Sequence, residues 1–318
     1  MRVSVAICTW NREALLWQAL VQMTMLDIPC GVEWELIVVN NNCTDQTDQV
    51  IRSFEGRLPL RRVFEPTPGQ SNARNAAVRA STGDYILWTD DDALVDPNWL
   101  SAYVEALGRW PRAAFFGGPV AEWFASPPPT WLQRGWPRVR SVFAVLDLGD
   151  KPFQIISQDR VPFGANWAVK GEFQRAYTYD QRLGVAPGRN FGGEETAFMR
   201  AMLSKGYEAW WVPSARVQHY IPAERMSIAF VRKHYVGYGE HLAASDIAAD
   251  GPIWFGSPRW LWKQAVVAEG KYRLRRLCCS PEVWVEDLID ASVAWGMLAQ
   301  LRSLTRRAGT LPVFGRSG

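Results

Sequence analysis

The N-terminal part of the chain alternates short apolar runs with segments of helical spacing, and this alternation constrains the fold more than any other feature. Val3–Cys8 and Leu36–Val39 are apolar and rich in β-branched residues, which is typical of buried strands. The further elements that the pattern predicts are helices at Arg12–Met25, Thr44–Phe54 (capped by Thr44 or Asp45) and Gly69–Ala80, strands at Arg61–Phe64 and Tyr85–Trp88, and a helix opening at Asp96 or Pro97. Such alternation predicts an α/β fold with a mostly parallel sheet flanked by helices.

The rest of the chain is less regular. Trp123–Arg140 is rich in proline and aromatic residues with little periodicity, which predicts a loop or lid, with short helices as an open alternative. The elements predicted beyond it are strands at Val161–Val169, Tyr207–Val212 and Ala215–His219 and a helix at Glu194–Lys205 ended by Gly206. After Ser227 the pattern is helical. We therefore divide the chain into a domain over 1–225 and a helical appendage over 226–318.

Composition and charge exclude several classes of protein. The chain has 318 residues and a net charge of +3, which gives no case for a nucleic-acid partner. No apolar run approaches the ~20 residues that cross a bilayer, and the N-terminus is better explained as a first strand than as a signal peptide. The five cysteines form no zinc-ligand pattern, and their odd number indicates reduced thiols. These features predict a cytoplasmic protein.

The strongest chemical signal is the triplet Asp90-Asp91-Asp92 directly after the strand Tyr85–Trp88. Ligands of open α/β sheets bind at the carboxyl ends of strands. Adjacent carboxylates repel one another and raise each other's pKa unless a positive charge intervenes, and Mg²⁺ or Mn²⁺ binds such oxygens together with phosphates and water. The triplet predicts a divalent metal site; a solvated acidic turn with a helix cap is the alternative.

The segment around this triplet resembles a known family. Gly69–Trp99, GQSNARNAAVRASTGDYILWTDDDALVDPNW, is similar to the core of the family 2 glycosyltransferases. The resemblance implies a GT-A fold in which a strand-terminal DxD motif binds the metal and the diphosphate of a nucleotide sugar. Asp90 and Asp92 match the DxD carboxylates, with Asp92 the stronger candidate for metal ligand, Asp90 also turned toward the ribose, and Asp91 between them. The family's G…ARN element, which flanks the nucleotide, is matched by Gly69, Arg74 and Asn75.

The resemblance extends upstream and downstream, over roughly the first 220 residues. It implies a nucleotide-sugar part over about 1–120 and an acceptor part over about 121–225. Upstream, the positions that match loops lining the base pocket are Thr9, Asn11, Arg12, Asn40 and Asn42. The family commonly has Asp where this chain has Asn40, and an amide both accepts and donates hydrogen bonds, so a uracil base stays open. Downstream, Asn166 in Pro162–Asn166 matches the strand beside the donor sugar; a turn residue is its alternative.

The motif Gly192-Gly193-Glu194-Glu195, heading a helix with Arg200, resembles the family's G-E-D helix start. There the second acid is the general base, which implies Glu195, with Glu194 as the alternative base or as a helix cap. His219 stands where similar enzymes complete the metal shell, although a lone His in an apolar strand is often structural.

These matches imply an inverting transfer to a saccharide or lipid-linked acceptor hydroxyl, with Mn²⁺ or Mg²⁺ as cofactor and a UDP-sugar as the favoured donor. Arg74 and the metal would offset charge on the leaving diphosphate, and Glu195 would take the proton. In the aromatic middle segment, Trp123, Trp131 and Trp136 are candidates for an acceptor platform or lid, with plain packing as the equal alternative.

The C-terminal region is basic and aromatic. Its features are Trp260, Trp262, Lys271, Arg273, Arg275 and Arg276, then an apolar helix around Val293–Leu304 followed by Arg306 and Arg307. This pattern predicts reversible contact with an anionic membrane on the inner face of the cell. The alternative is a helix that packs back on the catalytic domain.

Two other functions stay open at this point. A sugar-phosphate nucleotidyltransferase shares a related fold, but the loop Thr9–Arg12 contains no glycine, whereas that class opens with a glycine-rich loop. A non-catalytic carbohydrate-binding relative is compatible with the departures at Asn40 and Glu195.

Overall fold

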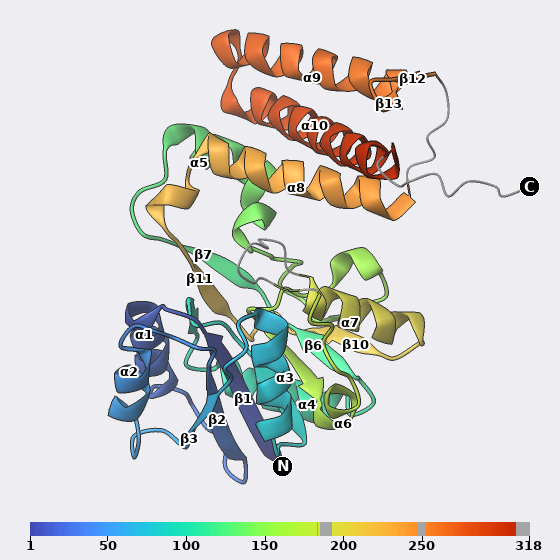
Figure 1. Cartoon of the computed structure of the whole chain (residues 1–318). Helices are drawn as coiled ribbons and strands as arrows, with labels where there is room; N and C mark the ends of the chain where they lie inside the picture. Colours follow the sequence, from blue (N-terminus) through green and yellow to red (C-terminus); the bar gives the residue numbers. More distant parts are fainter. Residues whose placement is uncertain (183, 185–192, 247–251, 310–318) are drawn as a thin grey trace, which may run out of the picture. The chain divides into compact units, whose positions relative to one another are not determined.

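The computed structural model describes residues 1–182, 184, 193–246 and 252–309 (Figure 1). These divide into two compact units. Unit 1 consists of Met1–Trp123 with Ala144–Tyr220, and unit 2 of Phe124–Phe143 with the chain from Ile221 onward. The predicted division has a single boundary at residue 225, whereas in the structure residues 124–143 group with the C-terminal helices.

Parallel strands form the N-terminal half of the sheet in unit 1. The elements are β1 Arg2–Thr9, α1 Glu13–Met23, β2 Glu33–Asn40, α2 Thr47–Ser53, β3 Leu60–Phe64, α3 Gln70–Ala80 and β4 Tyr85–Trp88. The strands lie in the order β3-β2-β1-β4 and pair in parallel. The predicted elements are confirmed except at α2, which begins later than expected because the Asp45 carboxylate accepts from both the backbone and the hydroxyl of Thr47.

The second half of the sheet is mixed in direction. Its strands are β6 Phe115–Gly117, β8 Phe153–Gln154, β9 Trp167–Lys170 and β10 Ala209–Trp211. They complete an eight-stranded sheet in the order β3-β2-β1-β4-β9-β6-β10-β8. β9 runs antiparallel to both of its neighbours, and β8 runs antiparallel to β10. The predicted parallel pairing therefore holds for the first half of the sheet and for the pair β6–β10.

The predicted strand Val161–Val169 was wrong at its start, because β9 begins only at Trp167. Pro162 has no backbone N–H to donate to a ladder, and its ring packs where a Cβ on Gly117 would lie. Residues 163–166 form a turn in which the Asn166 N–H donates to the Phe163 carbonyl.

Helices cover both faces of the sheet (Figure 1). On one face Val3 and Val5 of β1 pack with Leu16 of α1 and with α4 Trp99–Arg109, and on the other Ala6 packs with Ala77 of α3 and with α7 Glu194–Ser204. This alternation explains why β1 is apolar throughout, since both of its faces are buried. The short helices of unit 1 are η2 Gln158–Arg160 and α6 Gly171–Arg175.

A small second sheet, in the order β5-β11-β7, contains β5 Ala93–Val95, β7 Val120–Phe124 and β11 Val217–Ile221. β11 runs antiparallel to β5 and pairs His219 with Ala93. A residue far along the chain is therefore held beside the end of the aspartate triplet.

The proline-rich middle segment is more ordered than the sequence indicated. It forms helix α5 Thr130–Val139 and the turn η1 Arg140–Phe143, so the alternative of short helices holds for this part rather than the loop. Pro129 supplies the extended residue before the helix, and the buried residues Leu132, Gly135 and Val139 share one helical face. Pro137 inside the helix obscured this periodicity in the sequence.

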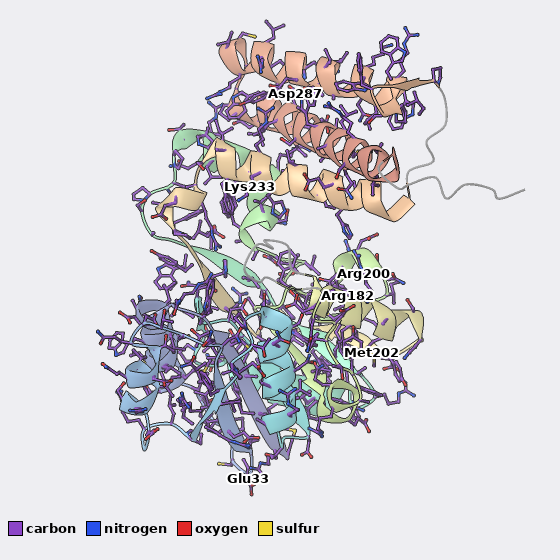
Figure 2. All side chains as sticks on the ribbon, in the orientation of Figure 1. Glu33, Arg182, Arg200, Met202, Lys233 and Asp287 are labelled. Carbon is purple, nitrogen blue, oxygen red and sulfur yellow. The ribbon has the colours of Figure 1, made fainter. Side chains whose placement is uncertain are left out.

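Unit 2 is helical, as predicted. Its elements are η3 Ala223–Arg225, α8 Ile228–Asp246, the hairpin β12 Ile253–Trp254 with β13 Ser257–Pro258, α9 Arg259–Cys278 and α10 Pro281–Gly309. α10 packs against α5, α8 and α9; Figure 2 labels Lys233 on α8 and Asp287 on α10. No helix in the described ranges is both long and apolar enough to cross a bilayer.

Two glycines let α8 and α10 approach closely. A Cβ on Gly239 of α8 would lie 2.1 Å from the carbonyl oxygen of Val293. Reciprocally, a Cβ on Gly296 of α10 would lie 2.0 Å from the carbonyl oxygen of Val236. The predicted apolar stretch Val293–Leu304 is thus part of an internal helix contact, and the side chains of Arg306 and Arg307 lie outside the described residues.

Candidate active site

The aspartate triplet follows β4 in unit 1 and is largely buried. Asp91 and Asp92 are 3% and 5% exposed. Burial, with the neighbouring Asp92 carboxylate, raises the pKa of Asp91 to about 7, against the opposing charge of Arg12. Burial also raises the pKa of Asp90. A simple solvated turn would not bury these groups, so the site requires positive charge.

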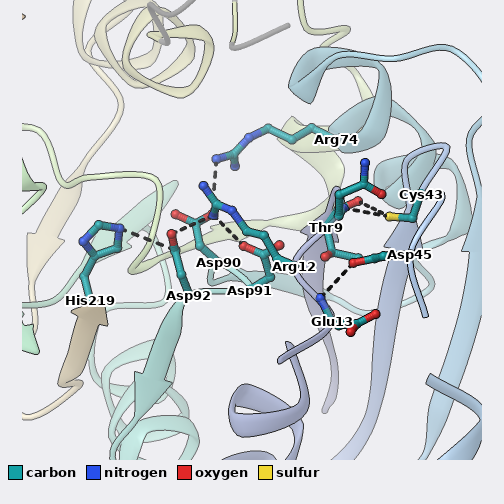
Figure 3. Close-up of polar contacts among 11 residues, drawn as sticks. Thr9, Arg12, Glu13, Cys43, Asp45, Arg74, Asp90, Asp91, Asp92 and His219 are labelled. Carbon is teal, nitrogen blue, oxygen red and sulfur yellow. Dashed lines mark hydrogen bonds and ion pairs between the residues drawn. The ribbon is translucent and has the colours of Figure 1, made fainter. Parts of the chain in front are cut away.

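Arg12 supplies part of that charge. Its Nη1 donates to Asp91 Oδ1 at 2.9 Å and to Asp92 Oδ2 at 2.6 Å (Figure 3). β1 lies beside β4, so the loops after both strands meet, and Asn11 takes the left-handed conformation (φ 52°) in that turn. The structure thus places Arg12 on the acidic cluster, whereas the family resemblance implied a base-pocket loop.

His219 lies on the other side of Asp92. Its Nε2 is 3.4 Å from Asp92 Oδ1, and the two side chains are 8% and 7% exposed (Figure 3). A carboxylate oxygen and an imidazole nitrogen at this separation fit a shared divalent cation. The described residues contain no cluster of three or more His, Cys, Asp or Glu side chains arranged to hold a metal. A cation here would therefore need substrate phosphates and water to complete its shell.

Arg74 of α3 connects this cluster to the acidic pair that begins α7. Its Nε donates to Glu194 Oε1 at 3.1 Å, and its Nη2 lies 4.0 Å from Asp90 Oδ1. The guanidinium, itself 2% exposed, stacks 5.1 Å from the centre of the Trp88 ring. A surface role for Arg74 is excluded, and Trp88 is a contributor that sequence analysis missed.

The two glutamates have different surroundings. Glu194 is 1% exposed and pairs with Arg74, and burial together with the Glu195 charge raises its pKa to about 7. Glu195 is partly exposed, and its buried Oε2 has no hydrogen-bond partner among the described residues. Gly192 of this motif lies outside those residues. Glu194 Oε2 is likewise buried without a partner among the described residues, so both carboxylates have acceptor capacity left at this site.

Gly164 lies directly beside Glu195 and Arg74. A Cβ on Gly164 would lie 2.6 Å from Glu195 Oε1 and 2.7 Å from Arg74 Nη2. The turn containing Pro162–Asn166 therefore contributes to the site through backbone at Gly164. In the sequence, Gly164 itself was the feature that could have indicated this close approach of the backbone.

Asn166 is not presented to a ligand. Its Oδ1 accepts from Trp99 Nε1 and Tyr103 OH, both at 2.8 Å. Its Nδ2 donates to the carbonyls of Pro119 at 2.9 Å and Ala215 at 2.7 Å. These bonds use the full capacity of an amide, and the residue is fully buried, which favours the structural alternative.

Several other predicted donor-site residues also have structural partners. Asn75 exchanges hydrogen bonds with the backbone of Tyr179, and Asn40 accepts from the Cys43 N–H and donates to Asp48. Asn42 is exposed, in a left-handed turn at φ 59°. Thr9 is buried at the end of β1.

Asn41, which sequence analysis passed over, shapes the loop before α3. Its Oδ1 accepts from the Gly69 N–H at 2.9 Å, and its Nδ2 donates to the carbonyls of Glu65 and Thr67. Gly69 has φ 129°, a conformation that favours glycine. This loop carries the chain from β3 to the helix that holds Arg74.

Trp131 and Trp136 pack inside unit 2. The ring centres of Trp131 and Trp284 are 6.0 Å apart, and the Trp136 ring contacts those of Phe124 and Phe143. Trp123 in unit 1 packs edge-on to Tyr220 at 4.8 Å. These contacts favour the packing alternative for all three tryptophans.

Comparison with known proteins decides the family. The model of glycosyl transferase family 2 matches residues 4–158, the span that holds the strands, the aspartate triplet and Arg74. The chain is a family 2 glycosyltransferase. The enzyme is 25% identical to the succinoglycan biosynthesis protein ExoM of Rhizobium meliloti, over 76% of this chain and 74% of that protein.

This glycosyltransferase is also 23% identical to the glucosyl-dolichyl phosphate glucuronosyltransferase of Haloferax volcanii, over 76% of this chain and 77% of that protein. Further curated relatives are covered over only 17% to 27% of their own length. Among solved structures, the mannosyltransferase PcManGT of Pyrobaculum calidifontis matches with a TM-score of 0.53 at 20% identity, over 98% of this chain and 76% of that one. The fold is GT-A, as predicted, and the nucleotidyltransferase and non-catalytic alternatives are set aside.

Proposed function

We propose that this enzyme transfers a sugar from a nucleotide-diphosphate donor to an acceptor hydroxyl in one displacement that inverts the anomeric centre. The observation that carries the proposal is the grouping of Asp90–Asp92, His219, Arg74 and Glu195 at the end of β4. Anion-binding groups and a carboxylate with an unpaired oxygen meet there, as a single displacement with a general base requires.

Glu195 is the proposed base, and Glu194 is the residue that holds Arg74. Both glutamates have an Oε2 without a hydrogen-bond partner among the described residues. Glu194, however, is buried and bonds the Arg74 guanidinium through Oε1, whereas Glu195 is partly exposed and can meet an acceptor hydroxyl. Arg74 lies between the acidic pair and Asp90, so its charge can offset negative charge that grows on a leaving diphosphate. Among the described residues of the site we assign none as a separate nucleophile for a covalent intermediate, which favours inversion over retention.

Asp92 and His219 are the proposed metal ligands, with Asp90 next to them. Mn²⁺ or Mg²⁺ would supply charge stabilisation for the leaving diphosphate when bound. The fit of the Asp92–His219 pair supports this, and PcManGT, which shares the fold, was solved with GDP-Man and Mn²⁺. Arg12 holds the other Asp92 oxygen and keeps the carboxylate oriented toward His219.

The donor would lie over the loops after β1 and β2 and before α3, near Thr9, Asn11 and Gly69. A UDP-sugar stays the favoured donor, although Asn40 is engaged with Asp48 and leaves base recognition to other groups. Relatives named for succinoglycan biosynthesis and for transfer to a glucosyl-dolichyl phosphate support a saccharide or lipid-linked acceptor in glycoconjugate synthesis.

The test is a screen of nucleotide sugars with Mn²⁺, which measures released nucleoside diphosphate and thermal stabilisation. Glu195→Gln should retain donor binding and lose transfer by about 10²–10⁴-fold, while the exposed Glu55→Gln should transfer at the wild-type rate. Asp92→Ala should abolish the Mn²⁺-dependent thermal shift. Wild-type transfer by both site variants would refute the assignment.

A further inference from the structure

Helix α9 of unit 2 has two apolar faces. Leu261, Ala265, Ala268 and Tyr272 recur at helical spacing and are buried. Leu261 and Ala265 share a core cluster with residues of α10. An ordinary surface helix would be polar on the side opposite this face.

The opposite side of α9 is apolar instead. Val266, Val267, Leu274 and Leu277, which we call the α9 ridge, are 58%, 47%, 67% and 86% exposed. At 100° per residue they lie within one face of the helix, roughly opposite the buried one. A contiguous exposed apolar ridge on a folded domain marks a contact surface.

The charged side chains of α9 are predominantly basic. The basic side chains of α9 are Arg259, Lys263, Lys271, Arg273, Arg275 and Arg276. Its acid is Glu269, which is paired with Arg273 at 2.8 Å and also with Arg232 of α8. Arg275 pairs with Asp287 of α10, and the Arg276 guanidinium lies over the rings of Tyr272 and Trp284. Lys263 and Lys271 are both exposed and can meet an anionic partner, although Lys271 also lies near the Asp290 carboxylate of α10.

An aromatic hairpin is fixed to the start of the same helix. Ile253, Trp254 and Phe255 are 53%, 49% and 82% exposed. Trp262 Nε1 of α9 donates to the Trp254 carbonyl, and the Arg259 guanidinium lies 4.6 Å from the centre of the Trp254 ring. Tryptophan and phenylalanine beside basic residues are characteristic of helices that lie in a bilayer interface.

We propose that α9 lies on an anionic lipid bilayer, with the α9 ridge in the headgroup–acyl boundary and Lys263 and Lys271 at the phosphates. This surface differs from the stretch Val293–Leu304 expected from the sequence, whose Ala294, Gly296 and Leu298 pack against other helices of unit 2. The inference stands apart from the transfer chemistry, because every residue proposed for catalysis belongs to unit 1.

Vesicle flotation of the full chain tests the proposal. We expect binding to vesicles of phosphatidylcholine with about 30% phosphatidylglycerol, and weak binding to phosphatidylcholine alone. Leu274→Glu with Leu277→Glu should lower partitioning at least tenfold, and Lys263→Gln or Lys271→Gln about fivefold each. Raising the salt from about 50 mM to 500 mM should release the protein.

Ile156→Glu is the matched control, because Ile156 is an apolar residue of unit 1 that is 82% exposed. It should float like the wild type. Thermal melting of each variant checks folding, and transfer to a soluble acceptor should be unchanged by the α9 variants. Absence of flotation, equal binding to neutral vesicles, or a dimer in solution that the leucine variants dissociate would each overturn the proposal; loss of transfer alone would bear only on the catalytic assignment.

Discussion

At the scale of single residues, the site combines buried charges that need one another. Arg74 is almost fully buried and forms ion pairs with Glu194 and Asp90. Removing one member of a buried ion pair leaves the other charge uncompensated, which is strongly destabilising. The residues around Arg74 therefore serve the fold and the proposed reaction together.

Asn166 tests how far a family motif can be transferred to a residue. Asn166→Ala would leave Trp99 Nε1 and the Ala215 carbonyl without this partner, and Tyr103 OH and the Pro119 carbonyl would each lose one of their hydrogen bonds. We therefore expect the free energy of unfolding to fall by about 2–4 kcal/mol. Asn72→Ala on α3, which loses one bond to the Pro68 carbonyl, should cost less than about 1 kcal/mol. Urea unfolding followed by tryptophan fluorescence measures both. If the Asn166→Ala protein were stable but bound the donor more weakly, Asn166 would contact the donor sugar, as the family motif implied.

The buried acids predict a pH dependence of stability. Asp91 and Glu194 have folded-state pKa values raised to about 7, so the native state holds protons that the unfolded chain has released. The free energy of unfolding of the metal-free protein should therefore fall as the pH rises from about 5 to 7. Hydrogen bonds to the carboxylates of Glu35 and Asp48 lower the pKa of each group. The stability that these two groups contribute is therefore lost only below the pH range of this prediction. Urea titrations with a chelator present measure the slope, and a rising stability over this range would contradict it.

At the scale of elements, the close approach of α8 and α10 depends on two glycines, Gly239 and Gly296, which have no side chain at the contact. Gly296→Ala would drive a methyl group into the Val236 carbonyl, and we expect a loss of about 1–3 kcal/mol. Gly270→Ala in α9 is the matched control, because open space surrounds its Cβ position, and it should stabilise by about 0.5–1 kcal/mol. Thermal unfolding of both variants checks the pair. Equal effects would show that helix propensity, rather than close approach, governs the site.

At the scale of the whole molecule, the two units interleave in sequence. α5 comes between strands of unit 1 in the chain, yet it packs against α10 of unit 2: a Cβ on Gly135 would lie 2.8 Å from a Val285 methyl, and Trp131 lies near Trp284. A cut at residue 225 therefore separates the two sides of one core.

We expect a fragment of residues 1–225 to expose the apolar face of α5 around Leu132 and Val139. Exposed apolar faces of this kind promote association. The fragment should elute as aggregates in size-exclusion chromatography and bind a hydrophobic dye more strongly than the full chain. A monomeric fragment with no dye binding would show that α5 does not need α10.

The sequence by itself determined the strands and helices up to β4, the family and the acidic triplet. These follow from short-range patterns, because a strand buried on both faces must be apolar throughout and a motif is contiguous in the chain. It did not determine the direction of β9, the helix over Thr130–Val139 or the partners of Asn166 and Arg12.

Those features depend on contacts between distant segments, which tertiary structure alone decided. Asn166 becomes structural only because Trp99 and Ala215 meet it, and His219 reaches Asp92 only because β11 pairs with β5. The same holds for α9, whose inner and outer apolar faces look alike in sequence until α10 covers one of them.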